Sequence, residues 1–193
     1  VLDNEGSAFD VCSPGEVELM RDCGIDASRC IYTHPIKSDE EIRAAITYGI
    51  TIFVVDNEDE LSKFVPYKDT IELLIRLSIE NPACLVNLSH KFGVSPKNTY
   101  SLITKARRKK LTVKGLSFHA GSQNENSLKF IEALEYCRDI CWKSAADGMP
   151  LEIVDIGGGF PINYIQNVPP PPQFCYPINE YLEKYFTSYR VIA

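Results

Sequence analysis

Asp155-Ile156-Gly157-Gly158-Gly159-Phe160-Pro161 is the stretch of sequence that decides the fold. It overlaps a short apolar run, Leu151 to Ile156, which is typical of a buried strand. Three successive glycines cost backbone entropy and offer no side chain to pack. They therefore fit a place where backbone N–H groups must approach a ligand, most often a phosphate. A tight strand-to-helix turn needs similar residues, and this stretch alone does not decide between the two.

A second apolar stretch, Leu116-Ser117-Phe118-His119-Ala120-Gly121-Ser122, is predicted to be a strand that ends in His, Gly and Ser. Between the two stretches, Ser127 to Gly148 carries apolar residues mostly at three- and four-residue steps, as in a helix. Strand, helix and strand form a βαβ unit, whose strands run parallel with their C-terminal ends on one edge. The sequence therefore predicts a ligand site in which His119, Ser122 and glycines 157–159 lie together.

The composition excludes several classes of partner. The 193 residues include 20 Lys and Arg against 26 Asp and Glu, a net charge of −6, and an acidic chain without a basic stripe argues against nucleic acid. The one basic cluster, Lys105 to Lys110, closes an amphipathic helix, where it complements the helix dipole. No apolar run has membrane-spanning length, and the seven cysteines show neither paired nor metal-ligand spacing. We expect a cytoplasmic protein with reduced thiols and no membrane, nucleic-acid or metal partner.

The whole chain alternates strands and helices about seven times, without hairpin signals, which predicts a parallel α/β fold. A polyproline spacer is expected at 169–172, because proline continues neither helix nor strand, and a short helix at 177–186. The other predicted strands are 8–11, 29–32, 50–55, 71–77 and one from Arg190. The other predicted helices begin near Ser13, Ser38, Asn57 and Ser95. Residues 78–93 are predicted to form a long loop.

The choice is between an open, doubly wound sheet and a closed (β/α)8 barrel. Polar residues near the C-terminal ends of the predicted strands, Asp10, Arg76, His119 and Asp155, favour the barrel. So does the glycine loop, which follows what would be the seventh strand if one is missing in front, where such barrels commonly place a phosphate. A typical barrel takes roughly 250 residues, so we expect 1–193 to be one partial barrel domain.

Four motifs resemble the ornithine/diaminopimelate/arginine decarboxylases, pyridoxal phosphate enzymes on an alanine-racemase-like barrel. They are Phe9-Asp10-Val11-Cys12-Ser13-Pro14-Gly15-Glu16, Lys91-Phe92-Gly93, Ser117-Phe118-His119-Ala120-Gly121-Ser122-Gln123 and the glycine stretch already quoted, and the resemblance covers the whole chain. It implies decarboxylation of a basic amino acid, ornithine-like before lysine, arginine or diaminopimelate, by a homodimeric enzyme of polyamine and amino-acid metabolism.

The resemblance also assigns roles. His119 is expected to stack on the pyridine ring of the cofactor, Ser122 to bond its phosphate, and the backbone of Gly157, Gly158 and Gly159 to surround that phosphate. By the same resemblance Arg76 lies beside the ring hydroxyl and Asp10 near the reactive face, while Asp155 orders the glycine loop.

Each role has a simpler structural alternative. His119 could be a packed polar residue, Arg76 could pair with Asp10 or another carboxylate of the edge, and Glu16 could only complement a helix dipole.

The family's Schiff-base lysine belongs on a first strand for which this sequence has no counterpart, since the earliest lysine is Lys37. We therefore assign no catalytic residue here and expect 1–193 alone to be inactive. A racemase on the same barrel is a weaker enzyme alternative. The alternative from another class is a non-catalytic homologue that binds a regulatory partner, as antizyme inhibitors do.

Overall fold

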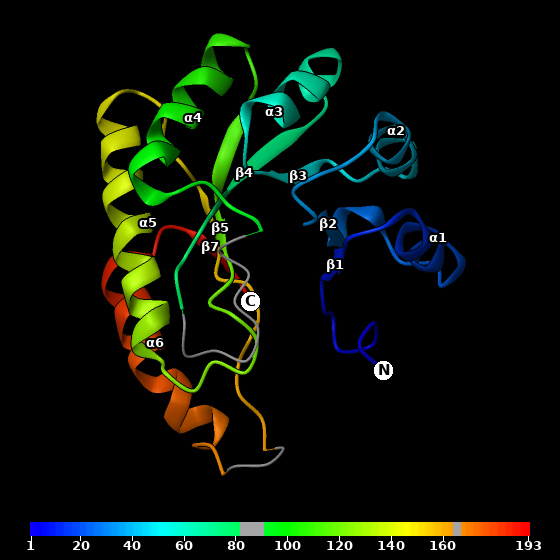
Figure 1. Cartoon of the computed structure of the whole chain (residues 1–193). Coiled ribbons are helices and arrows are strands. Elements are labelled where there is room, and N and C mark those ends of the chain that lie inside the picture. The colour runs from blue at the N-terminus through cyan, green and yellow to red at the C-terminus, as the bar shows by residue number, and fades with distance from the viewer. Residues whose placement is uncertain (82–90, 164–166) are drawn as a thin grey trace. The chain divides into compact units, whose positions relative to one another are not determined.

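The computed structural model describes residues 1–81, 91–163 and 167–193. They divide into two compact units, which we describe separately. The first comprises residues 1–75 and 102–113, and the second comprises 76–101 and 114–193. Figure 1 shows strands and helices alternating along the chain in both units.

Parallel strands in chain order form the first unit. Phe9 pairs with Cys30, Ile31 with Ile52 and Phe53 with Leu73, so β1 to β4 are successive parallel neighbours. The helices α1 and α2 contact each other. The elements are β1 (Phe9–Val11), α1 (Pro14–Asp22), η1 (Ala27–Arg29), β2 (Cys30–Tyr32), α2 (Asp39–Tyr48), β3 (Ile52–Val55), α3 (Glu58–Phe64), η2 (Val65–Tyr67) and β4 (Glu72–Leu77), whose last two residues belong to the second unit.

The boundaries of these helices have local causes. Ser38 caps α2 by accepting from the Glu41 amide, while the Glu41 carboxylate accepts from the Ser38 amide, a reciprocal capping box. Gly49 ends α2 in the left-handed region, with φ +115°. Ser13 and Asn57 cap α1 and α3 through their side chains, each of which accepts a hydrogen bond from the backbone amide three residues on. The predicted helix starts near Ser13, Ser38 and Asn57 are therefore confirmed.

One cation is buried in the core of the first unit. The side chain of Lys37 has no exposed surface, and its Nζ donates to the carbonyls of His34 (2.7 Å), Pro35 (3.1 Å) and Val54 (2.7 Å). Glu60 lies 4.0 Å away, and burial lowers the pKa of Lys37 to about 8. Lys37 thus links the segment that follows β2 to the Val54 carbonyl of β3.

The second unit is also built on parallel strands. Gly115 pairs with Ile153 and Ile153 with Arg190, so β5, β6 and β7 are successive parallel neighbours. In Figure 1, α5 and α6 lie side by side, in agreement with their direct contacts. The elements are α4 (Pro96–Arg108), which continues into the first unit at residue 102, β5 (Val113–Phe118), α5 (Leu128–Ala146), β6 (Ile153–Asp155), α6 (Pro171–Tyr185) and β7 (Arg190–Ile192).

Two predictions about the C-terminal third are wrong: the spacer at 169–172, and the start of the short helix predicted at 177–186, which is the later part of the longer helix α6. The predicted spacer at 169–172 is in part helical, because α6 begins at Pro171 and contains Pro177. A helix leaves its first four N–H groups unpaired, so prolines fit its first turn without losing a bond. Pro170 caps the helix through its carbonyl, which accepts from the Phe174 amide at 3.0 Å.

The bounds of the two strands that lead to the predicted site also differ from the prediction. β5 runs from Val113 to Phe118, so His119 to Ser122 form a loop beyond the strand rather than its last residues. β6 covers only Ile153–Asp155. The predicted loop 78–93 lies largely outside the described residues, because 82–90 are not among them. Within the described ranges, no helix is long and apolar enough to cross a membrane.

Candidate cofactor site

The glycine loop packs against the loop that follows β5. A Cβ atom on Gly157 would lie 2.2 Å from the Phe118 carbonyl oxygen, and one on Gly159 would lie 2.1 Å from the Gly121 oxygen. Both glycines also have left-handed φ angles, +64° and +97°. Side chains are thus excluded at both positions by space and by conformation. The sequence-based expectation that the two strand ends share one edge agrees with this geometry.

Gly158 differs from its two neighbours. A Cβ there would meet only His119 Nε2, at 3.9 Å, so this glycine borders open space beside the imidazole. Within the described part of the chain, the amides of Gly158 and Gly159 donate to no protein acceptor, and the Ser122 hydroxyl has no hydrogen bond. Backbone donors are therefore available to a ligand beside the His119 ring, and a hydroxyl donor lies three residues on in the same loop. Donors of both kinds suit a phosphate.

The loop does not end in a helix. Residues 157–163 and 167–170 contain no helical turn, and α6 begins only at Pro171. The strand-to-helix turn considered from the sequence is therefore wrong, and a helix dipole does not contribute to this edge.

Asp155 fixes the start of the glycine loop. Its Oδ1 accepts from the Gly157 amide at 2.8 Å, and its Oδ2 accepts from the Ser117 hydroxyl at 2.6 Å. The carboxyl group is almost completely buried, and burial raises its pKa, against the effect of these two hydrogen bonds and of Arg76. The prediction that Asp155 orders the loop agrees with this geometry.

Phe160 fixes the other end of the loop. Its ring stacks on Phe130 of α5, with centroids 4.9 Å apart, and meets Phe174 of α6 edge-on at 6.2 Å. Phe130 in turn contacts Phe118 at the end of β5. This aromatic cluster explains why a phenylalanine follows the glycines.

The His119 ring is held neutral. Its Nδ1 accepts from the Gly121 amide at 3.0 Å, which leaves Nε2 as the protonated nitrogen of the neutral imidazole. Partial burial and the positive charge of Arg76 both lower the pKa of His119. A neutral, half-buried ring beside open backbone donors is suited to stack on an aromatic ligand.

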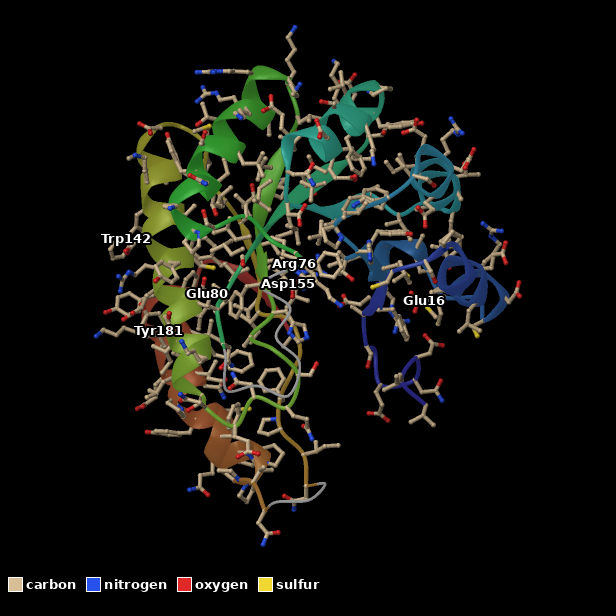
Figure 2. All side chains as sticks on the ribbon, viewed as in Figure 1. Glu16, Arg76, Glu80, Trp142, Asp155 and Tyr181 are labelled. Carbon is tan, nitrogen blue, oxygen red and sulfur yellow. The ribbon has the colours of Figure 1, made fainter. Side chains whose placement is uncertain are left out.

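Arg76 is the cation of this edge. It belongs to β4, and Figure 2 shows it close to Asp155, whose pKa its charge lowers. Its guanidinium lies 5.2 Å from the centre of the Phe92 ring. The neighbouring Gly93 has φ +94° and no room for a Cβ, which would lie 2.5 Å from the Ser78 nitrogen. Within the motif 91–93, Phe92 thus contacts Arg76, and Gly93 packs against the backbone of Leu77 and Ser78.

Asp10 is the middle residue of β1, in the first unit, and it pairs in register with Ile31. Its place near a cofactor stays a prediction. The reasoning from sequence also missed Ser117 and Asn81, whose buried amide donates to the Ala120 carbonyl at 2.8 Å. Ser117 was detectable in principle, because it is a polar residue inside an apolar strand.

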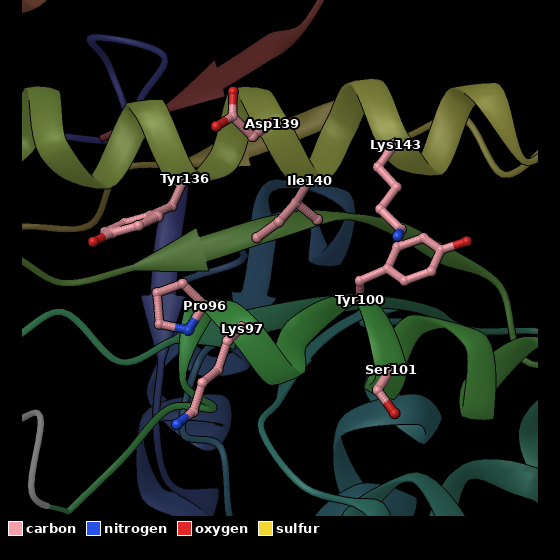
Figure 3. A pocket seen from close by; sticks show the side chains of 8 residues that line it. All are labelled: Pro96, Lys97, Tyr100, Ser101, Tyr136, Asp139, Ile140 and Lys143. Atoms are coloured by element: carbon pink, nitrogen blue, oxygen red, sulfur yellow. The ribbon is translucent and has the colours of Figure 1, made fainter.

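A separate groove of about 440 Å³ lies between the first turns of α4 and the middle of α5 (Figure 3). There the Lys143 ammonium lies 4.4 Å from the centre of the Tyr100 ring. None of the predicted site residues lines this groove. No group of three or more His, Cys, Asp or Glu side chains suited to a metal ion occurs in the described ranges.

The comparisons with known proteins identify the family. The family described as "Pyridoxal-dependent decarboxylase, pyridoxal binding domain" matches residues 1–193. The chain belongs to this family. Its cofactor is accordingly pyridoxal phosphate, as predicted.

Among solved structures, the chain is similar to lysine/ornithine decarboxylase from Vibrio vulnificus complexed with putrescine. The identity is 46% and the TM-score 0.92, over 100% of this chain and 51% of that one. This likeness confirms the predicted fold class, a pyridoxal phosphate-binding barrel domain of the (β/α)8 type.

Two curated relatives are informative. Lysine/ornithine decarboxylase of Selenomonas ruminantium is 35% identical over 157 residues, 81% of this chain and 40% of the relative. Antizyme inhibitor 2 of Xenopus laevis is 32% identical over 161 residues, 83% of this chain and 35% of the relative. The chain thus spans half or less of the length of these relatives.

Proposed function

We propose that the protein decarboxylates a basic amino acid, ornithine or lysine, with pyridoxal phosphate, and that the described edge of the second unit holds the cofactor. The observation that carries the proposal is the packing of Gly157 and Gly159 against the loop at His119, which leaves the Gly158 and Gly159 amides open beside the imidazole. The substrate class rests on the similar lysine/ornithine decarboxylases.

The roles of this chain's residues follow from their positions. The Gly158 and Gly159 amides and the Ser122 hydroxyl bind the phosphate, and the neutral His119 ring stacks on the pyridine ring. When bound, pyridoxal phosphate supplies the electron sink for the carbanion left by loss of CO2. Arg76, held by Phe92, adds positive charge beside the ring hydroxyl.

Asp10 is proposed to lie near the reactive face of the cofactor. We also propose that the protein is a homodimer, that residues 1–193 form one domain in it, and that it works in the cytoplasm on polyamine precursors. That residues 1–193 alone do not turn over stays a prediction, and the assay below tests it.

The second candidate function is a non-catalytic homologue that binds a regulatory partner, and the similar antizyme inhibitor 2 supports it. Against it, the glycines, His119 and Ser122 together offer the contacts that a cofactor needs. Cofactor binding therefore separates the two candidates.

The test is a titration of the purified protein with pyridoxal phosphate, followed by absorbance, and then an assay of CO2 release. We expect saturable binding, and no CO2 release by residues 1–193 alone. Where these residues stand in a protein that has the family's Schiff-base lysine, we expect faster CO2 release from ornithine or lysine than from arginine or diaminopimelate. His119→Ala should weaken binding by roughly two- to twelvefold, since stacking of this kind contributes about 0.5–1.5 kcal/mol beyond area burial. Absence of saturable cofactor binding would refute the proposal and leave the second candidate.

A further inference from the structure

Gln123 has an unusual backbone conformation for its residue type. Its φ is +52°, and only one other described residue besides glycines, Lys110, has a positive φ. An L-residue with a side chain pays roughly 1–2 kcal/mol for this region, and glycine would avoid the cost. The side chain of Gln123 must therefore provide something that a glycine cannot.

The side chain of Gln123 makes a two-point bond to the far end of the glycine loop. Its Oε1 accepts from the Ile162 amide at 2.9 Å, and its Nε2 donates to the Ile162 carbonyl at 3.1 Å. Both polar groups of one peptide residue are thus satisfied by one side-chain amide, as a neighbouring β-strand would satisfy them.

The next residue extends the connection. The Asn124 amide donates to the Gly159 carbonyl at 2.8 Å, so residues 123 and 124 together bond the glycine loop at two points three residues apart. The Gly159 carbonyl is thereby fixed on the side of the β5 loop. A peptide plane is rigid, so this bond fixes the plane that joins the Gly159 carbonyl to the Phe160 nitrogen. It thereby fixes the C-terminal side of Gly159, whose own amide donates to no protein acceptor among the described residues.

We infer that Gln123 is a positioning residue for the cofactor's phosphate: through Ile162 it holds the glycine loop in the conformation that directs the Gly158 and Gly159 amides to the anion. This inference rests on the proposed function, because it assumes that the loop binds the phosphate. Gln123 itself makes no contact with the cofactor in this scheme, and its effect passes through the backbone.

The informative variant is Gln123→Gly. It relieves the left-handed backbone while it removes both bonds to Ile162, so the protein should fold with nearly unchanged stability. The matched control is Lys110→Gly, which relieves the same strain (φ 61°) in the first unit. The readouts are the dissociation constants for pyridoxal phosphate and for pyridoxal, which lacks the phosphate, and hydrogen exchange at the Ile162 amide.

For Gln123→Gly we expect about tenfold weaker binding of pyridoxal phosphate, about 1.4 kcal/mol, with pyridoxal binding changed less than twofold. The Ile162 amide should exchange faster. Lys110→Gly should leave both affinities unchanged. If Gln123 had only a structural role, Gln123→Gly would weaken the binding of both ligands equally or lower the melting temperature.

The outcomes separate the two proposals. If the unsubstituted protein binds pyridoxal as tightly as pyridoxal phosphate, the proposed phosphate site is wrong, and this inference is refuted with it. If the unsubstituted protein binds pyridoxal phosphate more tightly than pyridoxal and Gln123→Gly keeps the full ratio of the two affinities, only the role of Gln123 is refuted. Unchanged exchange at Ile162 would refute that role as well.

Discussion

Substitution of alanine for single glycines tests the loop geometry most directly, because three glycines of the second unit differ in one factor at a time. Gly148 has φ +73° with no atom within 4 Å of a Cβ position, Gly157 has φ +64° with the Phe118 oxygen 2.2 Å from that position, and Gly158 has neither constraint. Alanine at the first measures backbone strain alone. Alanine at the second measures strain and a clash together.

The expected magnitudes follow from these contacts. Gly148→Ala should lower the free energy of unfolding by about 1–2 kcal/mol, the cost of a left-handed alanine. Gly157→Ala adds an overpacking cost of about 1–3 kcal/mol against a backbone carbonyl that no side-chain rotation can move, for a total of about 2–5 kcal/mol. Gly158→Ala should be neutral or slightly stabilising, because alanine reduces the entropy of the unfolded chain.

The assay is urea unfolding followed by circular dichroism, with thermal melts as a second measure. For a chain of this size each kcal/mol corresponds to roughly 2–4 °C, so Gly157→Ala should lower the melting temperature by roughly 4–20 °C. The order of destabilisation should be Gly157, then Gly148, then Gly158. If Gly157→Ala proved as stable as Gly158→Ala, the packing of this loop against Phe118 would be wrong.

Two further predictions concern the same edge. Asp155→Asn should lower the free energy of unfolding by about 1–3 kcal/mol, because the amide NH2 cannot accept a hydrogen bond and leaves either the Ser117 O–H or the Gly157 N–H without its acceptor; urea unfolding checks this, and an unchanged midpoint would contradict it. NMR titration of the His119 ring should give a midpoint below 6.5, because burial and Arg76 lower its pKa. Since the unfolded chain then takes up the proton first, stability should fall as the pH drops below about 6.5, and His119→Gln should reduce that dependence; a midpoint at or above 6.5 would contradict it.

The sequence by itself determined the local elements and their order. Ser38 and Glu41 stand at the spacing of a capping box, and the helix between them and Gly49 forms where that spacing predicts it. The βαβ pattern then required His119 and the glycines to meet, because parallel strands linked by a helix place their C-terminal ends on one edge. These inferences need only periodicity, capping residues and chain connectivity, all of which can be read along the chain.

Only the tertiary structure decided how the glycine loop is held. Ser117 and Asp155 are 38 residues apart, and Gln123 and Ile162 are 39 apart, so no local sequence pattern predicts either hydrogen bond. The start of α6 at Pro171 was hidden for a related reason: helix propensity counts against proline everywhere, whereas the first turn of a helix has no N–H bond to lose. Residue types and spacing determine which chemistry meets at an edge, but the orientation of each amide there depends on contacts that form only when distant segments pack.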